Sequence, residues 1–296
     1  MSSIHVADAD AEAVTPRVGW VGLGSMGQPM AARVLGAGWQ LTVWARSKER
    51  ARPLLELGAH WAPDLAELAQ RSTHVVTMLR SSDDVQQVWQ GLLPHLAAGT
   101  QAIDMTTAAP GVAAPLAQAL RQRGAHWLDC PVTGGLAGAR QGSLTLFVGG
   151  EEQALQGSQA LLAQLGRRIV ACGPAGSGYR TKLINQTLMA GALLGLAEGA
   201  ALARAGGMQG SELRDALDGG TGSGWMFDAY AQRMVDGGGA VGFTLAMLRK
   251  DLELALQAAE EFGRTGALLL RHALAAVEAA CERHGAQAGV QALSWD

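Results

Sequence analysis

The sequence has few of the side chains that build disulfide frameworks and metal sites. Its 296 residues hold three cysteines, Cys130, Cys172 and Cys281, which lie far apart and form no CxxC pair. The seven histidines include no HxxxH pair. We therefore expect no disulfide framework, no bound metal and no zinc-hydrolase helix, and we expect a reducing compartment.

An excess of basic charge is also absent. Lys and Arg number 23 against 26 Asp and Glu, which gives a net charge of −3. That balance offers no electrostatic basis for binding nucleic acid or an anionic membrane surface. Hydrophobic residues make up 48% and charged residues 17% of the chain, so a globular protein rather than a disordered one is expected.

Long uninterrupted hydrophobic runs are missing as well. A membrane helix needs about 18 apolar residues, and the nearest stretch, 188–202, is shorter and carries Glu198. Residues 1–15 contain acids but neither Lys nor Arg, unlike a signal or transit peptide. We predict a flexible N-terminal extension over 1–15, no membrane span and a cytoplasmic protein.

Short strand-like runs alternate with helical stretches over residues 16–178. After RVGWV (17–21) and LTVWA (41–45), further apolar runs lie at 74–79, 100–106, 126–132, 144–150 and 167–173. Several are nearly continuous, as expected for strands covered on both faces. The pattern predicts an α/β fold with a doubly wound, mostly parallel sheet of the Rossmann type.

The remainder of the chain, residues 179–296, is rich in Ala and Leu and has no strand-like runs. Helices are predicted at 179–204, 211–217, 225–235, 245–261 and 265–284. We expect an all-α domain for substrate binding and oligomerisation, joined to the first domain through the long helix. Gly191, Gly195 and Gly199 repeat every four positions on that helix. This stripe indicates close helix packing, either in a core or in a homodimer or homotetramer interface.

A glycine-rich turn with the pattern GxGxxG follows the first predicted strand and opens a helix. It consists of Gly22, Leu23, Gly24, Ser25, Met26 and Gly27. In a βαβ unit the first glycine allows the tight turn, the second lets a pyrophosphate approach the backbone, and the third lets helix and strand pack closely. The helix start then presents free N–H groups to the phosphates. We predict a dinucleotide site here, against the alternative of a turn that merely packs.

The residues after the second strand indicate which dinucleotide is bound. An NAD site usually has Asp or Glu there for the ribose 2′-hydroxyl. This chain instead has Arg46, Ser47 and Lys48, with no acid before Glu49. An arginine can stack on adenine and pair with a 2′-phosphate. The pattern favours NADP, with NAD still possible and a solvated basic turn as the alternative.

Polar residues gather in three later segments. The turn TGG (133–135) ends a strand, where a hydroxyl and free N–H groups could hold a carboxylate. Lys182, Asn185 and Gln186 fall at i, i+3 and i+4 and so share one face of the long helix. Lys250 lies inside a later helical pattern. Taken singly, each segment also suits an ordinary glycine turn or a solvated helix face.

Four motifs in order make the chain resemble the β-hydroxyacid dehydrogenase family, which includes 3-hydroxyisobutyrate dehydrogenase and tartronate semialdehyde (2-hydroxy-3-oxopropionate) reductase. The motifs are GLGSMG (22–27), DCPVTGG (129–135) with AGARQGSLTLFVGG (137–150), GSGYRTKLINQ (176–186) and LRKDLELA (248–255). The resemblance covers nearly the whole chain after Arg17. It implies a Rossmann domain, a long connecting helix and an all-α domain. It also implies a small acid substrate whose hydroxyl or aldehyde carbon is β to the carboxylate.

The resemblance further implies roles for individual residues. Lys182 matches the catalytic lysine, and Lys250 matches a lysine that reaches the cofactor. Asn185 and Gln186 match a polar pair that orients the substrate. The positions matching the substrate-binding turn are Thr133, Gly134 and Gly135, and those matching the nicotinamide side are Leu79 and Thr107.

Two positions depart from the family pattern, and two other functions stay open. Thr133 replaces the usual Ser, which keeps the hydroxyl but narrows the pocket, and Ala45 stands where many relatives have Asn. One alternative is an imine reductase of the same architecture. Those enzymes typically lack the lysine at this place, so Lys182 argues against it. The other is a non-catalytic cofactor-binding module that recognises a partner. The lack of a basic tail argues against this second alternative.

No histidine falls within these motifs, so Lys182 is the expected proton donor and acceptor. The expected reaction is hydride transfer between nicotinamide and the hydroxyl-bearing carbon. A free lysine, with a pKa of ~10.4, is a poor base at neutral pH. We therefore expect burial beside the positively charged oxidised nicotinamide to lower the pKa of Lys182.

Overall fold

The computed structural model describes residues 16–295, so the predicted extension over 1–15 lies outside the described residues. The strands are β1 (Arg17–Val21), β2 (Gln40–Trp44), β3 (His60–Trp61), β4 (His74–Thr77), β5 (Gln101–Asp104), β6 (His126–Asp129), β7 (Val132–Thr133), β8 (Leu144–Gly150) and β9 (Gly166–Gly173). Together they form a single sheet.

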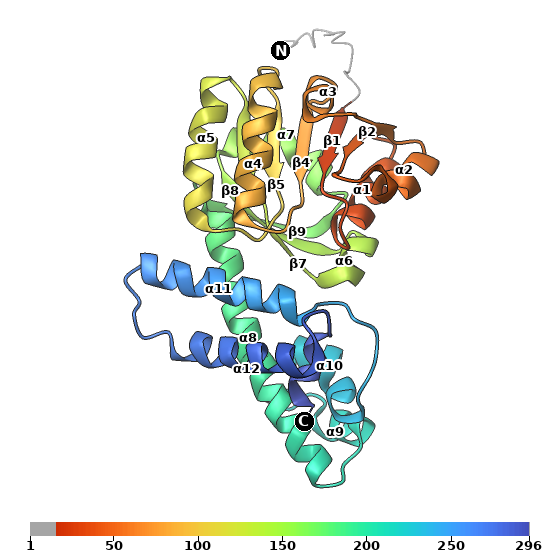
Figure 1. Ribbon diagram of the computed structural model, residues 1–296, viewed down its shortest axis with the longest axis vertical. Helices are drawn as coiled ribbons and strands as arrows, with labels where there is room; N and C mark the ends of the chain where they lie inside the picture. The colour runs from red at the N-terminus through yellow and green to blue at the C-terminus, as the bar shows by residue number, and fades with distance from the viewer. Residues whose placement is uncertain (1–15, 296) are drawn as a thin grey trace, which may run out of the picture.

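Helices cover both faces of that sheet, and after β9 the described chain forms helices without further strands (Figure 1). The helices of the first half are α1 (Gly27–Gly36), α2 (Arg52–Glu56), α3 (Leu65–Gln70), α4 (Ser82–Leu92), α5 (Ala113–Gln122), α6 (Gly135–Gln141) and α7 (Glu152–Leu162). Those of the second half are α8 (Ser177–Ala205), α9 (Gly210–Leu217), α10 (Trp225–Asp236), α11 (Leu245–Glu261) and α12 (Leu268–His284).

The sheet has the doubly wound order β3-β2-β1-β4-β5-β6-β8-β7, with β9 beside β8. The strands from β3 to β6 are parallel, whereas β8 runs antiparallel to β6 and β7. The chain order reverses between β1 and β4. In such sheets ligands bind outside the carboxyl ends of the strands at the reversal point. The glycine turn after β1 lies at that edge.

The sheet packs between two hydrophobic cores, one on each face. One contains buried side chains of α1, α2, α6 and α7, and the other contains those of α3, α4 and α5. Trp20 and Trp89 are the largest fully buried side chains, one in the first core and one in the second. The predicted doubly wound sheet is confirmed.

One predicted strand, 126–132, was wrong as a single element. The structure divides it into β6 and the two-residue β7. Pro131 lies between them, and proline has no N–H to donate to a strand partner. The break turns the chain so that β7 pairs antiparallel with β8. The sequence pattern also missed the short edge strand β3.

The described residues of the second half form helices joined by loops and no strand, as predicted. Helix α8 descends from the sheet, and α9 to α12 pack along it, α11 nearest the sheet and α9 at its lower end (Figure 1). Helix α8 is long and apolar enough to cross a membrane. This is weak evidence, because the core helices of soluble proteins often have the same length and composition. Lys182 and Gln186 are buried on α8, which suits a connecting helix better than a membrane span.

Candidate active site

The three glycines of the turn after β1 have three different surroundings. A Cβ on Gly22 would lie 2.2 Å from the carbonyl oxygen of Met78, and one on Gly27 would lie 2.0 Å from that of Gly22. Gly22 also has a φ of +99°, which side chains rarely adopt. A Cβ on Gly24 would meet nothing within 4 Å. Two glycines are therefore needed by the fold, and the third leaves open space beside the start of α1.

A hollow of about 270 Å³ adjoins this open space. The glycine-turn segment lines it with Leu23, Gly24, Ser25 and Gln28, and the segment after β2 lines it with Glu49, Arg50 and Pro53. The turn thus offers backbone N–H groups, a helix start and room, which fits the pyrophosphate of a dinucleotide. Of the predicted turn residues, Met26 is half-buried and packs against the core below.

The basic residues after β2 lie at the rim of the same edge. Arg46 is exposed and pairs with Asp84 in the first turn of α4. Ser47 donates its hydroxyl hydrogen to Glu49, and the Lys48 ammonium lies 5.8 Å from the centre of the Trp61 ring. Their predicted cofactor contacts stay predictions.

A chain of buried polar groups connects the two halves of the protein. Gln186 Nε2 donates to Asp251 Oδ2 at 2.6 Å, and Asn185 Nδ2 donates to Gln186 Oε1 at 2.9 Å. The other Asp251 oxygen lies 3.0 Å from Lys250 Nζ, which also donates to the carbonyl oxygen of Thr107 at 3.0 Å. The structure therefore brings together four predicted site residues from α8, α11 and the loop after β5.

Asp251 is the one member of this group of hydrogen-bonded residues that the sequence did not predict to belong to the site. It is buried on α11 among Leu248, Leu252 and Ala255. An acid at a core-facing helix position needs a partner, so the spacing of the apolar residues could have revealed it.

Lys182 lies on the buried stripe of α8, with only 6% of its surface exposed. Burial lowers its pKa to about 8, and the positive charge of Lys250 acts in the same direction. The negative charge of Asp251 opposes them. Within the described residues no carboxylate forms an ion pair with Nζ of Lys182. A buried lysine with this pKa can both accept and release a proton near neutral pH.

The predicted carboxylate-binding turn opens α6. Thr133 ends β7 and is half-buried, while Gly134 and Gly135 have φ values of +127° and +62°. No described hydrogen bond links Thr133 to Lys182, so their cooperation is still a prediction. The motif that contains this turn, DCPVTGG (129–135), nevertheless contacts α8 through its first residue, Asp129.

Asp129 fixes the beginning of α8. Its Oδ1 accepts the Gly176 N–H at 2.7 Å and its Oδ2 accepts the Tyr179 N–H at 3.0 Å. Burial raises the pKa of this carboxyl to about 6, and the backbone donors oppose the rise. A Cβ on Gly178 would lie 2.4 Å from the carbonyl oxygen of Asp129. This close approach places Lys182, one turn further along, at the carboxyl edge of the sheet.

A second buried acid, Asp104 at the end of β5, supports the same region. Its Oδ1 accepts the Tyr179 hydroxyl at 2.7 Å, and its Oδ2 accepts the Thr106 hydroxyl at 3.0 Å and the Thr77 hydroxyl. Burial raises the pKa of Asp104, and these donors oppose that rise. Thr106 also accepts the N–H of Leu79 at 2.9 Å, which orders the predicted nicotinamide side.

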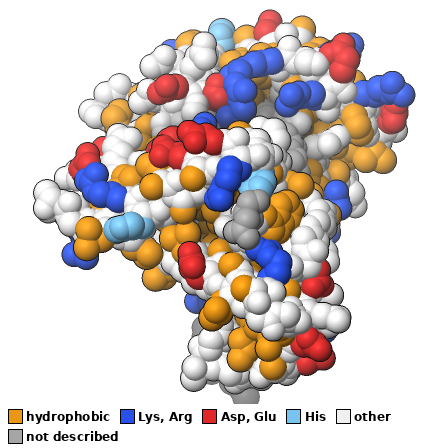
Figure 2. All heavy atoms as spheres, turned by 60° about the horizontal axis from the view of Figure 1, so that its bottom comes forward, with side chains coloured by type: hydrophobic (Ala, Val, Ile, Leu, Met, Phe, Trp, Pro, Cys, Tyr) orange, Lys and Arg blue, Asp and Glu red, His pale blue; other side chains and the backbone are white. Residues whose placement is uncertain are grey.

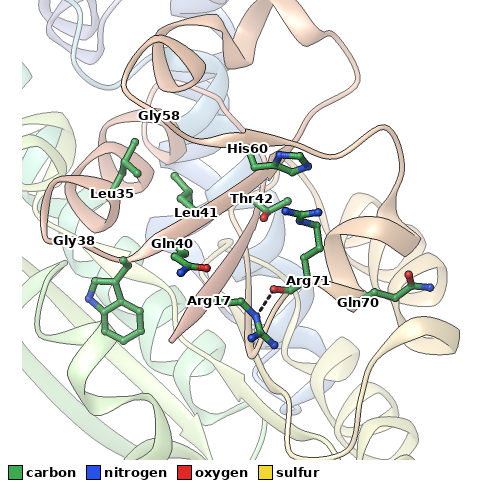
Figure 3. Close-up of a pocket in the computed structure, with 11 residues that line it drawn as sticks. Arg17, Leu35, Gly38, Gln40, Leu41, Thr42, Gly58, His60, Gln70 and Arg71 are labelled. Carbon is green, nitrogen blue, oxygen red and sulfur yellow. Dashed lines mark hydrogen bonds between the residues drawn. The ribbon is translucent and has the colours of Figure 1, made fainter. Parts of the chain in front are cut away.

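A larger hollow, of about 590 Å³, lies at the opposite edge of the sheet (Figure 3). Arg17, Gln40 and His60, the first residues of β1, β2 and β3, line it, and Arg17 Nε donates to the carbonyl oxygen of Arg71 at 2.9 Å. Because doubly wound sheets bind their ligands at the carboxyl ends of the strands, this hollow is not the cofactor site.

The fold and the glycine turn together define a dinucleotide-binding protein of the Rossmann class. Residues 17–173 match the family profile described as the NAD-binding domain of 6-phosphogluconate dehydrogenase. Residues 176–294 match the profile described as NAD-binding of NADP-dependent 3-hydroxyisobutyrate dehydrogenase. These two matches meet at the start of α8.

Similar proteins point to one family within that class. The chain is 35% identical over 258 residues to the NAD-dependent L-serine dehydrogenase of Pseudomonas aeruginosa, covering 82% of this chain and 85% of that protein. It is 33% identical over 252 residues to the mitochondrial 3-hydroxyisobutyrate dehydrogenase of Rattus norvegicus, covering 82% and 75%.

Solved structures agree. The 3-hydroxyisobutyrate dehydrogenase of Mycobacterium tuberculosis with L-serine superposes with a TM-score of 0.86 at 27% identity, covering 95% of this chain and 98% of the other. Psf3 in complex with NADP+ and 2-OPP gives 0.87 at 27% identity, covering 94% and 98%. The chain belongs to the β-hydroxyacid dehydrogenase family and is an NAD(P)-dependent dehydrogenase.

Proposed function

We propose that the protein interconverts a small 3-hydroxy acid and its semialdehyde, with Lys182 as proton donor and acceptor. The buried position of Lys182 on α8, without a paired carboxylate among the described residues, and its pKa of about 8 carry this proposal. The bound nicotinamide supplies or takes up the hydride. In oxidation the neutral Lys182 amine accepts the proton of the substrate hydroxyl. In reduction its ammonium polarises the carbonyl oxygen and returns the proton.

Orientation falls to the groups around Lys182. Asn185 and Gln186 present amides on the same helix, and Asp251 fixes the Gln186 amide at 2.6 Å. The turn TGG (133–135) offers a hydroxyl and N–H groups to a carboxylate. Holding the acid at one end and the hydroxyl at the other would keep the reacting carbon over the nicotinamide ring.

The named relatives support this substrate class. L-Serine and 3-hydroxyisobutyrate, named for two of them, share a carboxylate and a hydroxyl on the carbon β to it. We propose that this shared fragment is what the site recognises. Reduction of 2-hydroxy-3-oxopropionate stays within the proposal because its product carries the same fragment.

A substrate panel followed by the absorbance of reduced nicotinamide tests the proposal. It contains L-serine and 3-hydroxyisobutyrate for oxidation, and tartronate, methylmalonate and succinic semialdehydes for reduction. Methyl esters of the hydroxy acids are the matched controls. We expect turnover of at least one acid and a large rise in KM for its ester. Equal use of acid and ester would contradict a carboxylate-binding turn.

An imine reductase is the second candidate, because one from Pseudomonas sp. shares the fold with a TM-score of 0.63 at 23% identity. That likeness concerns the fold alone. A cyclic imine added to the panel separates the two: we expect no reduction of it.

We further propose a preference for NADPH that depends on Arg46. Arg46→Asp should weaken NADPH binding by about 1.5–3 kcal/mol, the range for a hydrogen bond to a charged group, and leave NADH binding much less affected. Titration of cofactor binding by fluorescence measures both affinities. Equal affinities in the unmodified protein, unchanged by Arg46→Asp, would remove this part of the proposal.

We also propose that the exposed face of α8 joins two copies of the chain. Leu188 and Leu202 are 71% and 76% exposed, and Gly195 and Gly199 have open space beside them. The alternative of packing inside the core is therefore wrong for these two glycines. Hydrophobic side chains also reach the surface over much of the helical half (Figure 2).

Light scattering after size exclusion tests the proposed association. Leu188→Glu should shift the protein toward monomers, because it places a charge in the apolar face. Leu57→Glu, at a residue that is similarly exposed but lies on the other half, should leave the mass unchanged. A monomeric unmodified protein would overturn the proposed interface.

A further inference from the structure

A carboxylate from the far side of the glycine turn holds Arg46. Strands β2 and β4 flank β1 in the sheet. Arg46 follows β2, and Asp84 lies in the first turn of α4, which follows β4. The ion pair between them therefore joins the two loops on either side of the predicted phosphate-binding turn.

The two partners differ in their exposure to solvent. The Asp84 side chain is 13% exposed, whereas that of Arg46 is 60% exposed. The backbone N–H of Asp84 donates to the Ser81 hydroxyl at 3.1 Å, which anchors Asp84 at the start of α4. Its second oxygen lies 3.3 Å from Nε of Arg80, another exposed arginine. Asp84 is thus a shielded charge between two exposed guanidinium groups.

We propose that Asp84 is a specificity-determining residue that competes with the cofactor's 2′-phosphate for Arg46. The inference rests on the proposed role of Arg46 in NADPH binding. A guanidinium already neutralised by a carboxylate attracts a phosphate less, so Asp84 weakens phosphate binding through Arg46. NADH carries a hydroxyl in place of that phosphate and leaves the ion pair intact. Asp84 therefore lowers the affinity for NADPH and leaves the affinity for NADH unchanged, so the preference for NADPH becomes smaller.

A pair of cofactor fragments isolates this effect from catalysis. 2′,5′-ADP and 5′-AMP differ by the 2′-phosphate, and calorimetry measures their affinities for the whole protein. Asp84→Asn should tighten binding of 2′,5′-ADP by about two- to fivefold, the range expected for a partly exposed charge pair, and leave 5′-AMP binding nearly unchanged. Asp84→Ser is a second variant that keeps a residue suited to a helix start.

Asp83→Asn is the matched control, because Asp83 is an exposed acid in the same first turn. It removes the same charge but should tighten 2′,5′-ADP binding far less. In an Arg46→Ala background, Asp84→Asn should lose its advantage over Asp83→Asn.

The outcomes separate the two proposals. Equal effects of Asp84→Asn and Asp83→Asn, or weaker 2′,5′-ADP binding in Asp84→Asn, would overturn the role of Asp84. So would an advantage that persists without Arg46. If Arg46→Ala alone leaves 2′,5′-ADP binding unchanged, the proposed role of Arg46 falls as well.

Discussion

The two ends of the proposed site are built in opposite ways. At the cofactor end, backbone groups of the glycine turn border open space, and the charged side chains, such as Arg46, lie at the exposed rim. At the catalytic end, Lys182, Gln186 and Asp251 are buried, Gln186 and Asp251 are hydrogen-bonded across two helices, and the charge of Asp251 acts on Lys182.

This difference decides how each end responds to change. Exposed charges are screened by solvent, so their individual contributions are small and depend on salt. Buried charges interact strongly and shift one another's pKa, as Lys182 shows. Substitutions at the cofactor end should therefore alter affinity, whereas those at the catalytic end should alter rate, pH dependence and stability together.

The largest effect is expected for Lys182→Met, which replaces the buried ammonium with an apolar side chain of similar length. Turnover should fall by about 10²–10⁴, the usual share of general acid–base catalysis. The free energy of unfolding at pH 7 should rise by about 1–3 kcal/mol, because burying this charge costs stability. Steady-state kinetics and urea unfolding measure the two effects.

The sign of the stability effect follows from the pKa shift. Folding lowers the pKa of Lys182 from 10.5 to about 8, so the unfolded chain binds more protons between these values. The gain in Lys182→Met should be complete below about pH 8 and vanish above about pH 10.5. Arg214→Met, at an exposed position on α9, should show neither effect. Full turnover in Lys182→Met would end the proposed mechanism.

A smaller effect is expected from Gly27→Ala and Gly24→Ala, which test the cofactor end. The Cβ of the first would lie 2.0 Å from the carbonyl oxygen of Gly22, so unfolding should cost about 2–4 kcal/mol less. The second should leave stability within about 0.5 kcal/mol yet weaken cofactor binding at least tenfold, because its methyl group occupies the open space. Equal stability losses in both variants would contradict the separation between fold and site.

The local geometry of the glycine turn could be predicted from the sequence because its signal is local. A GxGxxG turn between strand and helix specifies backbone geometry within a few residues, and the structure gives Gly22, Gly24 and Gly27 surroundings that suit their expected roles. The alternation of strands and helices similarly predicted the doubly wound sheet. Lys182 and Gln186 shared a helix face by their spacing alone.

The catalytic end could be predicted only in part because its partners are distant in sequence. Gln186 and Asp251 are 65 positions apart, and Tyr179 and Asp104 are 75 positions apart. Such pairs depend on how α11 and β5 are placed against α8, which periodicity does not specify. Arg46 and Asp84, 38 positions apart, meet only because β2 and β4 flank the same strand.

The smallest effect is expected from Asp251→Asn, which removes one charge from the buried chain. The charged groups acting on Lys182 are Asp251 and Lys250, and Asp251 raises the pKa. Without it the pKa should fall by about half to one unit, so the rate of oxidation should reach its half-maximum at a lower pH. Loss of one buried hydrogen bond should also cost about 1–2 kcal/mol of stability. Glu253→Gln, which removes an exposed acid of the same helix, should move neither quantity. A profile that keeps its midpoint, or moves to higher pH, would show that Asp251 supports the site through packing and not through the charge of Lys182.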